Sequence, residues 1–245
     1  MKKILIISDN LQLCKSVRKI SLSYLNNFAF SYSISPFSDK QKFDMYLEES
    51  TIVFDLKKQE DIRKIIDSYD LVISIHCKQL FPELLYSNVK CINVHPGYNP
   101  INRGWYPQVF AIVNNLMVGA TIHEIDEQID HGNIIARAFV EKEIIDTSKT
   151  LYDKILNKEL QLLEENIDSI LNNNYTTIVP ESEGNVYLKK DFNKLCKIDL
   201  EEKVTMLESI NKLRALTHGD FENAYFIDPI SNRKVIVSIN LKYQD

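Results

Sequence analysis

The sequence predicts an α/β fold built on a Rossmann-like, mostly parallel sheet, followed by a smaller C-terminal region that ends in a β-hairpin. Two observations support this prediction. In the first part of the chain, short apolar runs alternate with segments of helical periodicity, which is typical of a parallel sheet with crossover helices. From about residue 176 the pattern changes to short strand-like pieces, a mixed helix and a turn at residues 228–232.

The first half of the chain alternates strands and helices. Apolar or alternating runs predict strands at residues 4–7, 28–35, 51–54, 71–75 and 89–94. Leu13, Val17 and Ile20 recur at helical spacing, which predicts a helix over residues 11–25. A second helix over residues 61–69 has acidic residues in its first turn, where they complement the helix dipole.

The second half predicts a helix over residues 107–115 that begins at a proline. Two strands over residues 120–125 and 133–140 are joined by a loop at 126–132, and a long helix follows over residues 147–171. A helix near residues 200–213 precedes a hairpin with strands at 224–227 and 235–241. We expect a larger N-terminal domain over residues 1–178 and a smaller region over residues 179–245.

The composition excludes several classes of protein. The 245 residues are 44% hydrophobic and carry a net charge of −5, which argues against nucleic acid as the main partner. No apolar run approaches the roughly 20 residues of a membrane span, and the run at 4–7 is shorter than the roughly 7–15 residues of a signal sequence. The four cysteines are widely spaced, so we expect free thiols, a cytoplasmic protein and no metal site.

The strand at residues 89–94 leads into the most informative motif. Side chains two apart on a strand share a face, so Asn93 and His95 should project together where the strand ends at Pro96 and Gly97. Open α/β sheets bind ligands at the carboxyl ends of their strands. With Asp130 in the later loop, the set supplies an amide donor, a general base and a carboxylate, which suits the transfer of an acyl-level carbon.

Each of these residues also has a structural interpretation. A single histidine is more often structural than catalytic, and Asn93 or Asp130 could serve only a turn. The combination favours function, because residues 96–104 are too rich in Gly, Pro and Asn to pack as a regular element. A long polar loop beside the carboxyl edge of a sheet is typically a binding loop. The dinucleotide fingerprint Gly-x-Gly-x-x-Gly is absent after the first strand, where Ser8, Asp9 and Asn10 stand instead.

Three sequence stretches carry a family resemblance. They are Asn93-x-His95-Pro96, residues 103–107 (Arg-Gly-Trp-Tyr-Pro) and residues 130–132 (Asp-His-Gly). Together they resemble the formyltetrahydrofolate-dependent formyltransferases, whose fold is the one predicted above. Most relatives carry Ser-Leu-Leu-Pro after the histidine, whereas this chain has Pro-Gly-Tyr-Asn-Pro. In that respect the chain looks closest to the enzymes that formylate an amino sugar on a dTDP carrier.

The resemblance implies 10-formyltetrahydrofolate as co-substrate, with no metal, and assigns three catalytic roles. Asn93 would donate a hydrogen bond to the oxyanion, and His95 would remove a proton from the attacking amine. Asp130 would hold the histidine or a proton-carrying water. The residues expected to bind the folate are Cys77, Lys78, Gln79, Leu80, Ile125, Asp126, Glu127 and Gln128. The alternative for the first segment is that residues 79–85 only begin a helix.

The residues expected to bind the acceptor are Lys78, Tyr98, Asn99, Arg103, Trp105, Phe221 and Tyr225. Lys78 and Arg103 would bind a diphosphate, and Phe221 or Tyr225 would stack on thymine. The alternatives are solvated surface charges for the two cations and core positions for the two aromatic residues.

The implied reaction is transfer of the formyl group to dTDP-linked 4-amino-4,6-dideoxy-D-glucose, for a surface polysaccharide such as O-antigen, by a cytoplasmic homodimer. Other acceptors stay open: a dTDP-3-amino-3,6-dideoxyhexose, or a non-sugar amine such as a ribonucleotide or tRNA. A third possibility is a module that binds folate or nucleotide sugar without turnover. The intact set of Asn93, His95 and Asp130 argues against that possibility.

Overall fold

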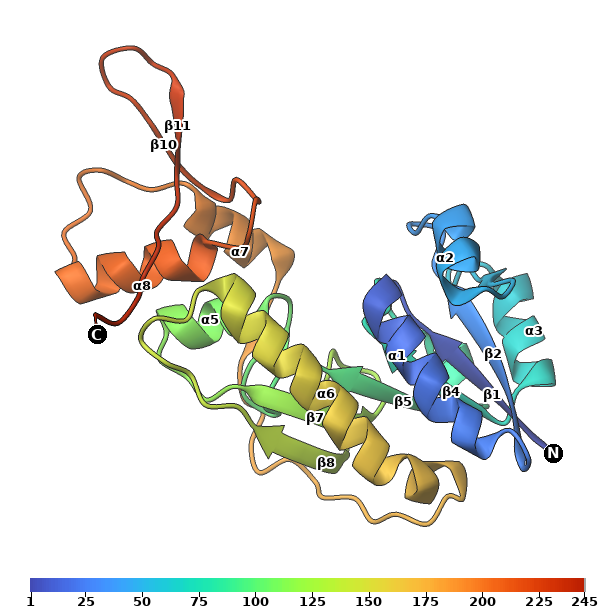
Figure 1. Ribbon diagram of the computed structural model, residues 1–245. Coiled ribbons are helices and arrows are strands. Elements are labelled where there is room, and N and C mark those ends of the chain that lie inside the picture. The colour runs from blue at the N-terminus through green and yellow to red at the C-terminus, as the bar shows by residue number, and fades with distance from the viewer. Residues whose placement is uncertain (245) are drawn as a thin grey trace. The chain divides into compact units, whose positions relative to one another are not determined.

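A computed structural model describes residues 1–244 (Figure 1). Within them, seven strands form one sheet in the order β3-β2-β1-β4-β5-β7-β8. The strands are β1 (Lys2–Ile7), β2 (Phe28–Ile34), β3 (Ile52–Val53), β4 (Leu71–Ile75), β5 (Lys90–His95), β7 (Gly119–Glu124) and β8 (Ile134–Phe139). The strands from β3 to β5 pair in parallel, and β7 pairs antiparallel to β5. The predicted mostly parallel sheet is therefore confirmed.

Helices connect the strands. They are α1 (Leu11–Ser21) with the short 3-10 turn η1 (Leu22–Tyr24), α2 (Lys40–Leu47), α3 (Gln59–Ser68), α4 (Glu83–Tyr86), α5 (Pro107–Val113) and α6 (Ser148–Leu171). Asn10 begins α1 by accepting a hydrogen bond from the backbone N–H of Leu13 at 3.1 Å. The remaining elements are β6 (Arg103–Gly104), β9 (Val186–Tyr187), α7 (Lys189–Cys196), α8 (Met206–Leu216), β10 (Ala224–Ile227) and β11 (Lys234–Val237).

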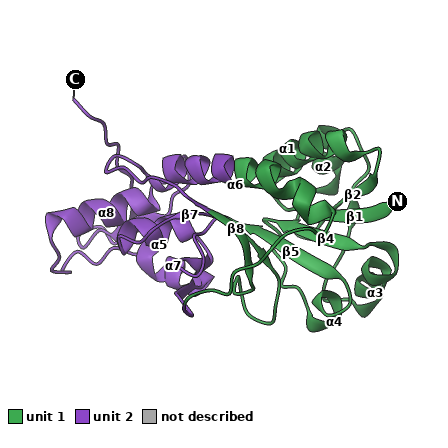
Figure 2. Ribbon diagram, turned by 90° about the horizontal axis from the view of Figure 1, so that it is seen from below, with its two compact units in different colours: residues 1–95, 121–137, 159–181 green, residues 96–120, 138–158, 182–245 purple. Residues whose placement is uncertain are grey.

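The chain divides into two compact units (Figure 2). Unit 1 comprises residues 1–95, 121–137 and 159–181, and unit 2 comprises residues 96–120, 138–158 and 182–245. The division runs through β7, β8 and α6. Unit 2 groups residues 182–245 with two earlier segments, 96–120 and 138–158. The domain boundary that we expect near residue 178 remains a proposal.

Unit 1 holds most of the sheet. Figure 2 shows α1 on one face of its strands and α3 and α4 on the other. Leu5, Ile65, Val72 and Leu85 are buried in one cluster, so β1, α3, β4 and α4 share a core. Buried strands covered on both faces explain the continuous apolar runs of the sequence. This core fixes the carboxyl ends of β1, β4 and β5.

Unit 2 has its own apolar core, drawn from α5, α6, α7 and α8. Phe110, Leu151, Phe192 and Leu216 belong to it. Strand β6 pairs in parallel with β9, and β10 pairs antiparallel with β11. The C-terminal hairpin is therefore confirmed, with β11 ending at Val237 rather than at residue 241.

Three helices differ from the sequence prediction. We did not predict α2 and α7, because each is only eight residues long, shorter than the roughly 11–18 residues over which helical periodicity is judged. The helix expected near residues 200–213 begins at Met206. The hydroxyl of Thr205 accepts from Glu208 N at 3.2 Å, and the Glu208 carboxylate accepts from Thr205 N at 2.7 Å, which forms a capping box. That capping signal was present in the sequence.

Candidate functional site

The end of β5 places two polar side chains on one face of the sheet. Cys91, Ile92 and Val94 are buried, which anchors the strand between β4 and β7. Asn93 and His95 alternate with Ile92 and Val94, and only 4% of His95 is exposed. The expected shared face of Asn93 and His95 follows from the two-residue period of the strand.

Asp130 meets both of these side chains. The amide Nδ2 of Asn93 donates to Asp130 Oδ1 at 3.0 Å. The other carboxylate oxygen, Oδ2, lies 3.4 Å from His95 Nδ1. The side chain of Asp130 is 14% exposed and that of His95 is 4% exposed, so their contact is largely shielded from water. The structure therefore brings together the three residues that we expected to be catalytic.

A fourth residue, His123 on β7, belongs to the same cluster. Its Nε2 lies 3.3 Å from Asn93 Nδ2 and 3.5 Å from Asp130 Oδ1. Its Nδ1 lies 2.7 Å from the carbonyl oxygen of Glu124, which can only accept. Nδ1 therefore carries the proton, and in the neutral ring Nε2 accepts a hydrogen bond from the amide of Asn93. The two hydrogens of that amide are directed at Asp130 and His123.

Sequence reasoning missed His123. The sequence feature that could have pointed to His123 is a polar side chain within the apolar strand predicted at residues 120–125. What makes it part of the cluster is the antiparallel register of β7, which sets His123 opposite Asn93. Register depends on long-range pairing and could not be read from either strand alone.

The segment after β4 is held at several points. His76 has a left-handed backbone with φ of 56°, and its Nε2 lies 2.9 Å from a carboxylate oxygen of Glu159, whose side chain is 1% exposed. The side chain of Gln79 donates to Phe54 O at 2.9 Å and accepts from Leu56 N at 2.9 Å. The side chain of Gln79 therefore serves the fold.

The remaining residues of that segment differ in exposure. Lys78 is exposed, and 74% of Leu80 is exposed. Burial raises the pKa of the Cys77 thiol to about 12, so the thiol stays protonated and is a poor nucleophile. These properties suit a surface that recognises a ligand by backbone groups and by Lys78 and Leu80.

The second expected folate segment follows β7. Ile125 donates its backbone N–H to Cys91 O at 2.9 Å, which ties the loop to β5. Asp126 accepts from Gln128 N at 3.0 Å and lies 2.7 Å from His131 Nδ1. This carboxylate thus shapes its own loop, which ends at Asp130.

The expected acceptor residues in the loop after β5 belong to unit 2. Asn99 is 1% exposed and Arg103 is 3% exposed, whereas Trp105 is 39% exposed. The guanidinium of Arg103 donates to Glu183 O at 2.7 Å. Arg103 is therefore a buried link to residues 182–187 and not a solvated charge.

Residues 182–187 run along this loop. Asn185 N donates to Pro100 O at 3.3 Å, and Trp105 N donates to Tyr187 O at 2.8 Å. A Cβ on Gly184 would lie 1.8 Å from Pro100 O, so the close approach requires glycine. Tyr98 is half-buried beside Gly119. We call residues 182–187 the strap.

The two C-terminal aromatic residues have different surroundings. Phe221 is 72% exposed and lies edge-on to His218 with ring centroids 5.7 Å apart. Tyr225 is half-buried in β10, and Lys234 Nζ lies 4.4 Å from its ring centroid. Phe221 is thus the more accessible of the two for stacking on a ligand.

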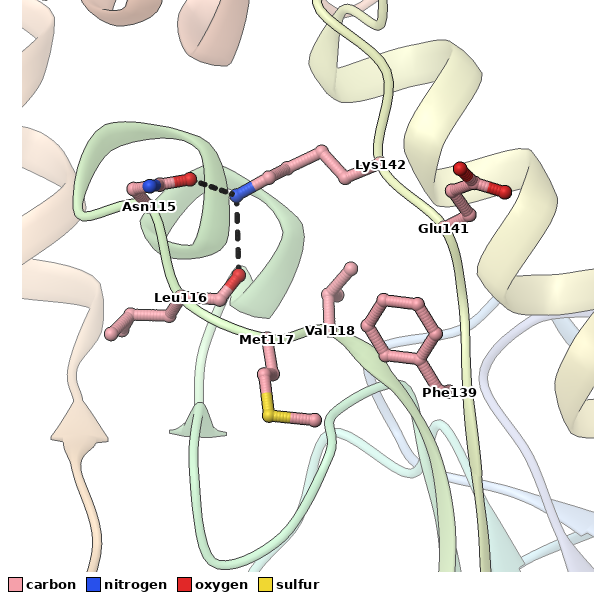
Figure 3. Close-up of a pocket in the computed structure, with 7 residues that line it drawn as sticks. All are labelled: Asn115, Leu116, Met117, Val118, Phe139, Glu141 and Lys142. Carbon is pink, nitrogen blue, oxygen red and sulfur yellow. Dashed lines mark hydrogen bonds between the residues drawn. The ribbon is translucent and has the colours of Figure 1, made fainter.

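A cavity of about 320 Å³ in unit 2 contains none of the expected site residues (Figure 3). It is lined by Asn115, Leu116, Met117, Val118, Phe139, Glu141 and Lys142. Lys142 Nζ donates to Ala111 O at 2.7 Å and to Leu116 O at 3.2 Å, so it caps the carbonyl end of α5. The charge of Lys142 is engaged in holding the helix end.

Two features are absent from residues 1–244. In this part of the chain no cluster of His, Cys, Asp and Glu has the arrangement to hold a metal ion. No helix within the same residues has the length and apolarity to cross a membrane. The four cysteines are all free.

Comparison with known proteins gives a consistent picture. A family model described as formyl transferase matches residues 39–167, and one described as an N-formyltransferase dimerization C-terminal domain matches residues 191–243. Over 183 residues, the chain is 50% identical to dTDP-4-amino-4,6-dideoxyglucose formyltransferase of Mycobacterium tuberculosis, covering 75% of this chain and 78% of that protein.

Solved structures agree with the sequence comparison. A 4-N formyltransferase from Francisella tularensis is 42% identical, covers 99% of both chains and superposes with a TM-score of 0.91. A sugar N-formyltransferase from a Shewanella species is 36% identical, covers both chains fully and has a TM-score of 0.94. The fold, the cluster at the end of β5 and these similarities together identify the chain as a member of the formyl transferase family.

Proposed function

We propose that the protein transfers a formyl group from 10-formyltetrahydrofolate to the amino group of dTDP-4-amino-4,6-dideoxyglucose. The observation that carries the proposal is the convergence of Asn93, His95 and Asp130 at the carboxyl end of β5. We infer the acceptor from the similarity to the dTDP-4-amino-4,6-dideoxyglucose formyltransferase of Mycobacterium tuberculosis. The sequence Pro-Gly-Tyr-Asn-Pro after His95, in place of Ser-Leu-Leu-Pro, supports the same acceptor. The product would serve the synthesis of a surface polysaccharide.

In the proposed mechanism, folate supplies the formyl group, and the chain supplies polarisation and proton transfer. Asn93 donates a hydrogen bond to the formyl oxygen as negative charge develops there. One of the two hydrogens now directed at Asp130 and His123 turns to that oxygen. Such a donor typically accelerates a reaction by about 10²–10³-fold.

His95 is proposed as the proton acceptor. The attacking amine must lose a proton as its bond to the formyl carbon forms, and an imidazole is suited to accept it near neutral pH. The bond between the formyl carbon and N10 of the folate then breaks, and the leaving nitrogen takes up a proton, which the imidazolium can supply. Asp130 lies 3.4 Å from His95 Nδ1, so its carboxylate can stabilise the imidazolium that results. In this mechanism Asn93 polarises the formyl group, and His95 accepts the proton with Asp130 as its carboxylate partner.

The folate is proposed to bind along two segments, Cys77–Leu80 and Ile125–Gln128. The chemistry of these segments suits a flat heterocycle, since Cys77 is a neutral thiol and Leu80 offers exposed apolar surface. Because the side chains of Gln79 and Asp126 are engaged within the fold, their contribution would come from backbone groups.

The acceptor is proposed to bind through Lys78, Tyr98, Asn99, Arg103, Trp105, Phe221 and Tyr225. Exposed Lys78 fits a diphosphate contact. Buried Arg103 fits a diphosphate less well, because it already donates to Glu183 O. Exposed Phe221 and Trp105 offer faces on which thymine could stack.

A homodimer is proposed to form through residues 191–243, which match the dimerization model. Met206, Leu207 and Ile230 in this range are 75%, 56% and 94% exposed. Free cysteines favour a reducing compartment, so we propose a cytoplasmic location. We also retain residues 1–178 as the proposed catalytic domain.

The test is an assay with 10-formyltetrahydrofolate and a panel of amine acceptors. Formylation of dTDP-4-amino-4,6-dideoxyglucose supports the proposal. Preferential formylation of a dTDP-3-amino-3,6-dideoxyhexose or of a ribonucleotide would show that this other amine is the acceptor. No product with any acceptor, together with tight binding of folate or dTDP, makes it a binding module.

Variants test the catalytic roles in the same assay. Asn93→Ala and His95→Ala should each abolish turnover while the circular dichroism spectrum stays that of the wild type. Asn88→Ala is the matched control, because Asn88 is exposed and outside the cluster. Near-normal activity of either cluster variant would remove that residue from its proposed role.

A further inference from the structure

One carboxylate gathers three loops at the carboxyl edge of the sheet in unit 1. Asp9 follows β1, and its Oδ1 accepts from Ser35 N at 3.0 Å, from Ser35 Oγ at 2.6 Å and from Ser38 Oγ at 2.6 Å. Its Oδ2 accepts from Lys78 N at 2.7 Å. The loops after β1, β2 and β4 therefore share one charged anchor.

The sheet topology explains why one side chain reaches all three loops. Strand β1 pairs in parallel with β2 on one side and with β4 on the other. The loop that leaves β1 lies between the loops that leave its two neighbours. The backbone N–H of Asp9 also donates to His76 O at 3.3 Å, so Asp9 holds the segment after β4 at two points.

The chemistry requires a carboxylate. An ionised carboxyl group has about four lone-pair sites and no donor, and Asp9 faces four donors in the described part of the chain. An amide in its place would direct an N–H group at another donor. Hydrogen bonds that involve a charged partner are also stronger than neutral ones.

The anchored loops present exposed side chains. Phe37, between Ser35 and Ser38, is 64% exposed. Lys78 is exposed although its neighbours His76 and Gln79 are both tied down by side-chain contacts. Asp9 thus fixes the backbone from which the exposed side chain of Lys78 extends.

We infer that Asp9 is a positioning residue that sets the affinity for the acceptor diphosphate by fixing the backbone of Lys78. The inference rests on the proposed function, in which Lys78 contacts that diphosphate. Asp9 precedes residues 39–167, which match the formyl transferase model. It is also separate from the cluster of Asn93, His95 and Asp130, so it affects binding more than the chemical step.

The experiment is a double-mutant cycle in the full chain. Asp9→Asn should raise KM for the dTDP-amino sugar by about 10-fold or more, since it replaces a charge-assisted hydrogen bond to the Lys78 backbone by a neutral one, and kcat should change less than KM. Lys78→Ala should also raise this KM. In the Lys78→Ala background, Asp9→Asn should have little further effect, because the group that Asp9 positions is gone.

Two controls separate positioning from general stability. Ser38→Ala removes one donor and leaves the bond between Asp9 and Lys78, so KM should stay near the wild-type value. Asp67→Asn changes an exposed carboxylate and should leave both KM and Tm unchanged. If Asp9→Asn does not fold by circular dichroism, Asp9→Ser replaces it in the same cycle.

The outcomes separate this inference from the proposed function. A folded, active Asp9 variant with an unchanged KM for the acceptor overturns the inference and leaves the proposed function intact. The same holds if the free-energy changes from the KM effects of Asp9→Asn and Lys78→Ala are additive in the double variant. A wild-type protein that formylates no dTDP-amino sugar overturns the proposed function. In that case titration of the wild type and Asp9→Asn with dTDP still tests the inference. A weaker affinity of Asp9→Asn for dTDP supports it, and an equal affinity overturns it.

Discussion

Asn93 of β5 lies opposite His123 of β7, and the amide nitrogen of Asn93 is 3.3 Å from Nε2 of His123. The carbonyl of Glu124 fixes the proton of that histidine on Nδ1, 2.7 Å away. His123 therefore orients the amide that is proposed to polarise the formyl group.

The first prediction concerns His123→Ala. This variant should lower kcat by about 10-fold or more, because loss of a buried hydrogen-bond partner costs about 1–3 kcal/mol and frees the amide of Asn93 to rotate. KM for the acceptor should change little. Steady-state kinetics with the amine acceptor check this prediction. A kcat equal to that of the wild type would leave His123 with a purely structural role.

The second prediction concerns the charge of Asp130. Its φ of 47° lies in the left-handed region, which asparagine also tolerates, so Asp130→Asn preserves the backbone and removes the charge. The new amide would face Asn93 Nδ2, and His95 would lose its anionic partner. We expect kcat to fall by about 10²-fold or more, as for loss of an electrostatic catalytic group.

Single-turnover rates with saturating substrates measure this effect. The thermal unfolding curve of Asp130→Asn should remain close to that of the wild type, which shows that the fold is preserved. A single-turnover rate within threefold of the wild type (about 0.65 kcal/mol) would show that the carboxylate charge has no catalytic role.

The third prediction concerns the strap, residues 182–187. Gly184 has φ of 62°, and an added Cβ would meet Pro100 O at 1.8 Å. Gly184→Ala should therefore push the strap from the loop at residues 98–105 and raise KM for the acceptor. Residues held in such a conformation cost about 1–3 kcal/mol, so Tm should also fall.

Gly219→Ala is the matched control for this variant. Gly219 has φ of 55°, but nothing lies within 4 Å of its added Cβ. The two substitutions share the backbone strain and differ in the clash with Pro100. If both variants show the same KM and Tm, contact between the strap and the loop does not determine acceptor binding.

The fourth prediction concerns stability and pH. Burial alone would raise the pKa of Asp146, but hydrogen bonds from Glu143 N, Lys154 and Thr150 outweigh it and lower the pKa below the ordinary value of 3.8. A carboxyl group with a lowered folded pKa stabilises the fold above its unfolded pKa. That stabilisation is lost as the pH falls from 3.8 through the folded value.

Asp146→Asn should therefore lower the free energy of unfolding by about 1–3 kcal/mol at pH 7, as expected when a buried charged partner is lost. The difference between variant and wild type should shrink at pH 3. Urea unfolding at the two pH values measures it. An equal difference at both pH values would show that the charge of Asp146 does not stabilise the fold.

The sequence alone determined the elements that depend on local pattern. The apolar run before Asn93 predicted a buried strand, and its two-residue period predicted that Asn93 and His95 share a face. Helix α8 was predicted too early, although Thr205 and Glu208 carried its capping signal. Helices α2 and α7 were missed because each is only eight residues long, too short for a periodic pattern to stand out.

Only the tertiary structure decided which distant residues meet. The antiparallel register of β7 brings His123 to Asn93, and the order of β2, β1 and β4 lets Asp9 bond to both Ser35 and Lys78. The strap reaches Pro100 across more than eighty residues of sequence. Periodicity reports which face of an element is buried, whereas pairing and register arise from packing between elements far apart in the chain.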